Sequence, residues 1–518
     1  EYTQDYALLH NLCLGNKVLL LTATPFNNQP ADIYALIKLF QIPSRSTLKT
    51  VENLGASFKD LIDKYRVLRE EQRKGEATDE EIKQEVNDIA KKIRSIISPL
   101  VVRRSRLDLQ DIPEYAEDLK QQNIQLVLPN DPGELEYDLS ELKDLYLTTL
   151  DRISKSEGSS NDVYRFKAAR YSPALYIREE LKENLAQELE DKTGVKFNLL
   201  IGRQANISSF MRHLLVARFE SSVAAFQSSL GYMIQSSEHM LRWIEKRNKI
   251  PVFKKGNLPD VEAFYDSSDD NMDEIEELFE KYEAKGFFEI DMKYVKDDFV
   301  SDVQADIQLL KNLREQWFGK ENTIKSDPKL DSFIQIIQKQ MENEPNRKLI
   351  VFSEFADTVN YLGEALVKAG LPVMKYTSAD ATPVNKDRIR ANFDAGLKLS
   401  MQQNDFHILI ATDAISEGYN LHRAGAIFNY DIPYNPTRVI QRIGRINRIN
   451  KKVFDELYIY NYFPTDVGEA ETRTKEISTI KMAMIHAIMG EDTKALTKEE
   501  EIKAFFKERY RKEIAHNE

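Results

Sequence analysis

The sequence contains very little cysteine and no long apolar run. Cys13 is the only cysteine among 518 residues, which excludes an internal disulfide and a cysteine-cluster metal site. No apolar stretch reaches the ~20 residues that span a bilayer, and no histidine pair has the spacing of metal ligands. The sequence therefore predicts a cytoplasmic protein with no membrane segment and no metal site of its own.

An excess of basic residues is also missing. The formal net charge is -12, so the chain as a whole does not attract a polyanion. Any contact with nucleic acid has to come from a local groove that gathers a few basic or polar groups.

Strand and helix patterns alternate strictly after Asp327. The apolar runs predict strands at Lys348–Phe352, Val373–Tyr376, Phe406–Thr412, Ala426–Tyr430 and Leu457–Phe463. Helices are predicted at Asn385–Asp394 and Pro436–Ile449 among others, and Asp357 is placed to cap the helix after the first of these strands. This alternation predicts an α/β fold, with a parallel sheet covered by helices on both faces.

The first 325 residues show a different pattern. Val18–Thr22 is a continuous apolar run, which predicts a strand buried on both faces. Two charged helices are predicted at Ala56–Leu68 and Asp79–Ile97. The pattern beyond them is mostly helical, and Asn206–Lys246 is its longest periodic segment.

Several predicted strands end in polar residues. Thr22 and Thr24 follow the first apolar run, and Ser353 and Thr412 end two later strands. Ligands of open α/β sheets bind at the carboxyl ends of the strands, which makes these hydroxyls candidate site residues. Serine and threonine at strand ends also commonly cap the next helix, so both interpretations stay open.

Three arginines follow the fourth of the later strands. Arg442, Arg445 and Arg448 recur at three-residue intervals, so a helix would present them on one face. Neighbouring guanidinium groups repel each other unless an anion lies between them, and arginine suits bidentate contact with phosphate. A solvent-exposed face, or a brace to acidic neighbours, is the alternative interpretation.

The order of these segments resembles that of superfamily 2 nucleic-acid-dependent ATPases, in particular the Swi/Snf type and its bacterial RNA-polymerase-associated branch. LLLTATPFNN, KLIVFSEFADT, ILIATDAISEGYNL and QRIGRINRI are similar to motifs III, IV, V and VI. VVRRSRLDL resembles the Arg-Arg box after the first motor lobe, where Arg103, Arg104 and Arg106 would bridge the lobes, contact phosphate or form salt bridges within the linker. The resemblance implies a RecA-like second motor lobe and ATP-driven movement along duplex DNA.

Two parts of the superfamily pattern are absent. The sequence contains neither the phosphate-binding Gly-x-x-x-x-Gly-Lys-Ser/Thr loop nor the Asp-Glu-x-His motif that holds Mg²⁺. We therefore expect a C-terminal portion of a motor, with ATP and Mg²⁺ bound in the intact protein and no ATPase activity in this chain alone. Ser416–Gly418 replaces the two glycines usual in motif V, which favours the polymerase-associated branch.

The resemblance also implies roles for single residues. Arg445 and Arg448 match arginine fingers that reach the γ-phosphate of ATP. The positions that match other ATP-binding residues are Gly418, Asn420, Gln441 and Arg442. Ser353 and Thr412 match contacts to the nucleic-acid backbone, and Thr22 and Thr24 of motif III would couple the nucleotide state to that contact. Tyr419 and Tyr434 could stack on a base, but aromatic residues near strand ends more often belong to the core.

The expected domains are a remnant of the first RecA-like lobe at 1–110, an α-helical insertion or linker at 111–325, the second lobe at 326–465 and a C-terminal helical extension at 466–518. The insertion would bind a protein partner, guide DNA or serve only packing. The leading function is a DNA translocase. The alternatives are a strand-separating helicase of a restriction or defence system and a non-enzymatic interaction module derived from a motor.

Overall fold

The computed structural model describes residues 4–22, 29–74, 79–102, 106–124, 126–154, 164–193, 196–253, 287–415, 418–449, 453–465, 474–489, 494–497 and 500. The chain divides into two compact units of several segments each. The first comprises residues 1–133, 433–460 and 476–518, and the second residues 134–432 and 461–475. No helix in the described ranges combines the length and apolar character needed to cross a membrane.

A six-stranded sheet has the strand order β1-β8-β7-β4-β6-β5. Four of its strands lie wholly in the second unit: β4 (Lys348–Phe352), β5 (Val373–Tyr376), β6 (Ile408–Ala411) and β7 (Ala424–Asn429). Strand β4 pairs in parallel with both β6 and β7, and β5 pairs in parallel with β6. The short β1 (Gly133–Leu135) and β8 (Tyr458–Tyr462) extend the sheet beyond β7.

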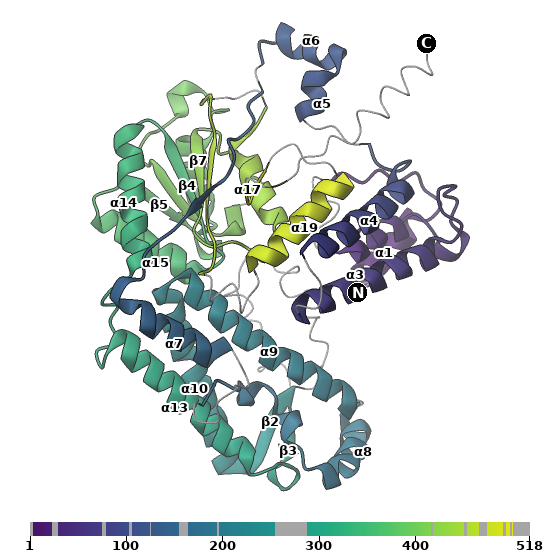
Figure 1. The fold of residues 1–518 in the computed structure, drawn as a ribbon, viewed down its shortest axis with the longest axis vertical. Helices are drawn as coiled ribbons and strands as arrows, with labels where there is room; N and C mark the ends of the chain where they lie inside the picture. Colours follow the sequence, from purple (N-terminus) through teal and green to yellow (C-terminus); the bar gives the residue numbers. More distant parts are fainter. Residues whose placement is uncertain are drawn as a thin grey trace. The chain divides into compact units, whose positions relative to one another are not determined.

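The central strands are buried along their whole length, as their continuous apolar runs predict. Every residue of β4, β6 and β7 is buried, which requires cover on both faces of the sheet. The chain runs from β4 through α15 (Ala356–Lys368) to β5, and from β5 through α16 (Pro383–Phe393) to β6. Figure 1 shows α14 (Pro328–Asn343) and α15 beside these strands. The predicted α/β fold with a parallel sheet is confirmed, and the bounds of β4 and β5 are those predicted.

The predicted cap of α15 is wrong. The N-cap residue is Phe355, whose side chain makes no capping hydrogen bond, and Asp357 lies in the first turn of the helix. Its carboxylate forms an ion pair with the fully buried guanidinium of Arg218, a residue far away in the sequence. Long-range pairing of a buried arginine has therefore replaced the local bond, because an unpaired buried charge is costly.

A bundle of helices precedes the sheet in the second unit, and residues 143–318 are called the helical arm below. Its elements are α7 (Lys143–Ser154), α8 (Lys182–Thr193), α9 (Phe197–Ser221), α10 (Val223–Arg247), the antiparallel hairpin of β2 (Lys249–Phe253) and β3 (Phe287–Asp291), and α13 (Asp298–Phe318). The longest periodic segment, Asn206–Lys246, contains parts of two helices rather than one. The break is at Ser222, whose backbone is extended and whose side chain accepts a hydrogen bond from Ala225 N at 3.1 Å. Aromatic rings fill the space between α9, α10 and α13, with Phe219 lying 4.6 Å from Phe226 and 5.2 Å from Trp317.

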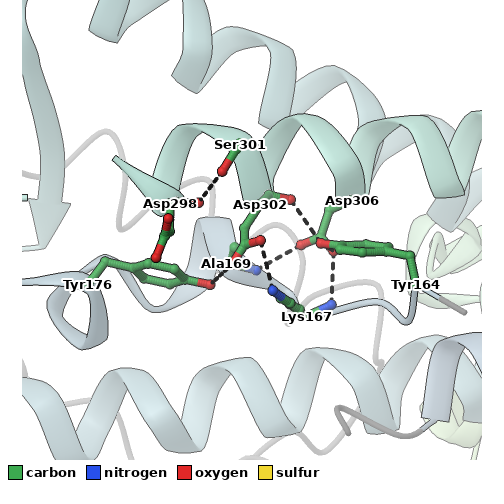
Figure 2. Close-up of polar contacts among 8 residues, drawn as sticks. All are labelled: Tyr164, Lys167, Ala169, Tyr176, Asp298, Ser301, Asp302 and Asp306. Carbon is green, nitrogen blue, oxygen red and sulfur yellow. Dashed lines mark hydrogen bonds and ion pairs between the residues drawn. The ribbon is translucent and has the colours of Figure 1, made fainter. Parts of the chain in front are cut away.

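A buried carboxylate fixes the loop that crosses α13 (Figure 2). Asp306 accepts hydrogen bonds from Lys167 N, Ala169 N and the Tyr164 hydroxyl at 2.9, 2.9 and 3.0 Å. Between the two amides, Ala168 has φ +54°, which L-residues other than glycine adopt at a cost. One carboxylate thus holds two backbone N–H groups around a strained residue.

The first unit contains helices packed by conventional apolar contacts. Figure 1 labels α1 (Gln4–Cys13), α3 (Leu54–Lys74), α4 (Asp79–Ile97), α5 (Arg106–Asp111), α6 (Pro113–Gln121) and α17 (Thr437–Ile446) of this unit, and α19 (Thr474–Met489). α2 (Pro30–Lys38) packs on α3, with the rings of Tyr34 and Phe58 stacked at 4.9 Å. The helices predicted at Ala56–Leu68 and Asp79–Ile97 are confirmed.

The strand predicted at Val18–Thr22 is wrong. These residues form no strand, and Leu19 and Leu21 are 84% and 88% exposed. A strand buried on both faces needs partner strands to accept its backbone hydrogen bonds. The described residues between 4 and 102 contain no strand that pairs with it.

Candidate functional site

Polar groups gather where β4 and β7 end. Ser353 follows β4, and its hydroxyl donates to Asp431 Oδ2 at 2.5 Å. The backbone N–H of Glu354 donates to the other oxygen of the same carboxylate, Oδ1, at 2.7 Å. Ser353 also accepts a bond from Phe355 N at 3.2 Å, at the start of α15. The carboxyl edge of the sheet therefore centres on Asp431.

Asp431 is a residue that the sequence analysis missed. It directly follows the predicted strand Ala426–Tyr430, so the rule that polar strand ends mark a site would have selected it. A lone aspartate before Ile-Pro also suits an ordinary turn, and that is why the pattern did not single it out.

Ser353 and Thr412 lie next to each other, as the parallel pairing of β4 with β6 requires. Phe352 is opposite Ala411, and Ser353 N donates to Ala411 O at 3.2 Å. Neither hydroxyl residue has exposed surface. Ser353 faces Asp431, while Thr412 Oγ1 accepts a bond from Ala414 N at 3.4 Å. The contact of these two residues with nucleic acid stays a prediction. Their bonds to backbone N–H groups just after each strand are of the kind expected if they cap the next helix.

The loop after β6 contains the other motif V candidates. Gly418 has φ +76°, and no atom lies within 4 Å of the position a Cβ would take, so the backbone conformation rather than crowding favours glycine. Asn420 is exposed. Tyr419 is buried and its hydroxyl lies 2.6 Å from that of Tyr376, which places it in the core. Ser416 and Glu417 lie outside the described residues.

A cleft of about 380 Å³, open to solvent, lies beside this edge. Buried charges line it: Lys329 donates to the carbonyl oxygens of Glu220 and Ser221 at 2.8 and 3.0 Å, and Asp431 lies on its wall. Burial raises the pKa of Glu220, although Thr465 donates two hydrogen bonds to its carboxyl group. Burial lowers the pKa of Lys329, and the carboxylates of Asp431 and Glu220 oppose that shift.

The arginine candidates belong to the first unit. Helix α17 ends at Ile446, two residues before Arg448, so the prediction of three arginines on one helical face is wrong. Asn447 has left the helical conformation, and its carbonyl oxygen accepts a bond from Arg106 of the Arg-Arg box. Arg442 is fully buried, Arg445 is half-buried and Arg448 is exposed.

The remaining candidates give less information. Gln441 lies on α17 and is half-buried. Thr22 is exposed and belongs to no strand, and Thr24 lies outside the described residues. The roles of all three stay predictions.

Residues 328–450 match the helicase conserved C-terminal domain. The matched segment begins at the first residue of α14 and includes Ser353, Thr412, Asp431 and the three arginines. It covers less than half of the chain.

Individual relatives are similar over part of the chain. The chain is 30% identical over 154 residues to the "Uncharacterized ATP-dependent helicase YqhH" of Bacillus subtilis, covering 29% of this chain and 25% of that protein. It is 27% identical to the "Probable ATP-dependent RNA helicase DDX28" of Mus musculus, covering 28% and 26%. It is 25% identical to the "RNA polymerase-associated protein RapA" of Vibrio cholerae, covering 25% and 13%.

The similarity to these relatives is therefore partial. The matched regions span about a quarter or less of these three relatives. Together with the parallel sheet, the match at 328–450 supports a superfamily 2 helicase C-terminal lobe in this chain.

Proposed function

We propose that this chain supplies the second RecA-like lobe of an ATP-dependent, nucleic-acid-stimulated motor of the Swi/Snf type, which translocates along duplex DNA. One observation carries the proposal: the helicase C-terminal match at 328–450 coincides with a parallel sheet whose carboxyl edge gathers Ser353, Thr412 and Asp431. In open α/β sheets this edge binds the ligand. Nucleic acid would lie along the carboxyl edge of the sheet, and residues of α17 would contact the bound nucleotide.

The three arginines then have different roles. Arg448 is exposed and Arg445 half-buried, which suits guanidinium groups that contact the γ-phosphate of ATP bound to the other lobe. Arg442 is fully buried, so it suits a brace that holds α17 rather than a direct contact. Gln441, Gly418 and Asn420 complete the nucleotide contact.

The residues of this chain suit only half of the chemistry of ATP hydrolysis. When bound, Mg²⁺ neutralises charge on the transferred phosphoryl group. The phosphate-binding loop and the Asp-Glu-x-His motif that would hold ATP and Mg²⁺ do not occur in the sequence. The chain alone should therefore hydrolyse no ATP, and activity should require a polypeptide that carries those motifs.

The relatives' names support a second candidate, because two of the three are called helicases and one of these an RNA helicase. Strand separation and translocation differ in what they displace. The test uses the protein that also carries the ATP- and Mg²⁺-binding motifs, in two assays. The first measures displacement of a triplex-forming strand from duplex DNA, and the second measures separation of a forked DNA or RNA duplex. Displacement of the third strand without duplex separation supports the translocase. Separation of the fork supports the helicase and would refute the translocase.

A further inference from the structure

Buried hydroxyl groups form a chain between the helical arm and the sheet edge. Ser222 Oγ lies 2.7 Å from Thr358 Oγ1, and Thr358 Oγ1 lies 2.8 Å from Ser221 Oγ. Ser221 Oγ lies 2.6 Å from Asp431 Oδ2. The two serines form the corner between α9 and α10, whereas Thr358 is in α15 and Asp431 follows β7. All four residues are buried.

The hydrogen bonds between these hydroxyl groups can run in only one direction. A carboxylate accepts hydrogen bonds and donates none, so Ser221 donates its only hydroxyl hydrogen to Asp431. Thr358 must then donate to Ser221, and Ser222 must donate to Thr358. Ser222 is also the acceptor for Ala225 N at the start of α10. The carboxylate of Asp431 therefore sets the orientation of all three hydroxyl hydrogens.

The same carboxylate holds the strand end. Asp431 accepts from the Ser353 hydroxyl and from Glu354 N, in addition to Ser221. Loss of the donor on the arm side therefore leaves the carboxylate that holds Ser353 with one hydrogen bond fewer and less fixed in position. Buried networks of this kind respond as a unit because few other partners are available to their members.

Two further contacts hold the α9–α10 corner. The buried guanidinium of Arg218, on the last turn of α9, forms an ion pair with the partly exposed carboxylate of Asp357 in α15. Lys329, on α14, donates to the carbonyl oxygens of Glu220 and Ser221. These carbonyls belong to the last turn of α9, whose final C=O groups have no partner within the helix.

We propose that Asp431 is a positioning residue that joins the helical arm to the carboxyl edge of the sheet, so that the arm and the Ser353 strand end move as one body. The arm would be part of the motor's moving lobe rather than inert packing. For the motor, this consequence rests on the proposed function. The junction itself does not.

The test of the junction is hydrogen exchange on the chain as it stands. Ser221→Ala removes the arm's donor to Asp431 and keeps a good helix former at the end of α9. We expect exchange of the Glu354 amide to accelerate at least about twofold, although Glu354 and Ser221 are far apart in sequence and are linked here through Asp431. Coupling energies within hydrogen-bond networks correspond to about twofold or more. Ser228→Ala, an exposed serine of α10, is the matched control and should leave Glu354 unchanged.

Two variants of Thr358 distinguish loss of the hydroxyl group from general unfolding. Thr358→Val keeps the shape and removes the hydroxyl, so it should reproduce the effect of Ser221→Ala at Glu354. Thr358→Ser keeps the hydroxyl and should restore wild-type exchange. A Glu354 amide that exchanges at the wild-type rate in both Ser221→Ala and Thr358→Val would overturn the junction, as would an equal effect of Thr358→Ser and Thr358→Val.

The consequence for the motor is measured on the intact protein. Ser221→Ala should leave the kcat of nucleic-acid-stimulated ATP hydrolysis near wild type and raise the ATP consumed per base pair moved. An unchanged ratio would contradict the moving-arm proposal. A wild-type protein without stimulated hydrolysis would instead refute the proposed motor, while the exchange experiment would still decide the junction.

Discussion

Replacing Asp306 by asparagine should destabilise the helical arm in a manner that depends on pH. The carboxylate uses both oxygens: Oδ1 accepts from Lys167 N and Tyr164, and Oδ2 accepts from Ala169 N. An amide offers one acceptor, and its NH₂ group would face an N–H or a hydroxyl donor. Leaving a buried donor without an acceptor costs about 1–3 kcal/mol.

The pH dependence follows from the raised pKa of Asp306. Burial raises this pKa from 3.8 to about 6, although the three hydrogen bonds favour the charged form. In the unfolded chain the carboxyl group loses its proton near its ordinary value, so between pH 4 and 6 the folded state binds more protons. The free energy of unfolding therefore falls as pH rises through this window, by up to about 3 kcal/mol for this group. Asparagine does not titrate, so the stability difference between wild type and Asp306→Asn should narrow as pH rises.

Urea unfolding followed by tryptophan fluorescence measures the stability difference between wild type and Asp306→Asn within the helical arm. The chain has two tryptophans, Trp243 on α10 and Trp317 on α13, and both belong to the arm. Asp298→Asn, an exposed aspartate of the same helix, controls for the loss of one negative charge. A gap between wild type and Asp306→Asn that stays constant from pH 4 to 7, or widens as pH rises, would refute the reasoning.

Two other substitutions test the same unit. Ala168→Val should destabilise the arm by at least about 2 kcal/mol, because a β-branched residue is strained at φ +54° and the buried site has no room for it; an unchanged urea midpoint would contradict this. Lys329→Met should cost about 3–5 kcal/mol, because it removes the donor to the carbonyls of Glu220 and Ser221 and leaves buried carboxylates without their counter-charge. A thermal melt within a degree of wild type would show that Lys329 has no such role.

The sheet could be predicted from sequence because its strands are short, apolar and separated by clear helix signals. Lys348–Phe352 and Val373–Tyr376 were predicted to the residue. The apolar run at Val18–Thr22 has the same local character, yet it forms no strand, since strand formation depends on partners that the run itself does not encode. Local pattern therefore predicted the elements only where their partners are also present.

The site was less predictable because its bonds join residues that are far apart in sequence. Asp357 was predicted to cap a helix and instead pairs with Arg218, and nothing in the sequence around Ser353 predicted its hydrogen bond to Asp431. No periodicity in the sequence links α9 to β7. The helix that carries the arginines ends at Ile446, and helix ends are the least certain feature of such patterns.

The most direct test of the proposed motor is phosphate release by the intact protein in the presence of duplex DNA. Wild type is compared with Arg445→Ala, Arg448→Ala and, as control, Arg390→Ala, an exposed arginine of α16. If the two motif VI arginines act as fingers, each alanine variant should lose up to ~10³–10⁵ in rate, with DNA affinity and melting temperature close to wild type. Turnover near wild type in both variants would contradict the assignment of the arginines and the proposal that this lobe completes an ATP-hydrolysing site.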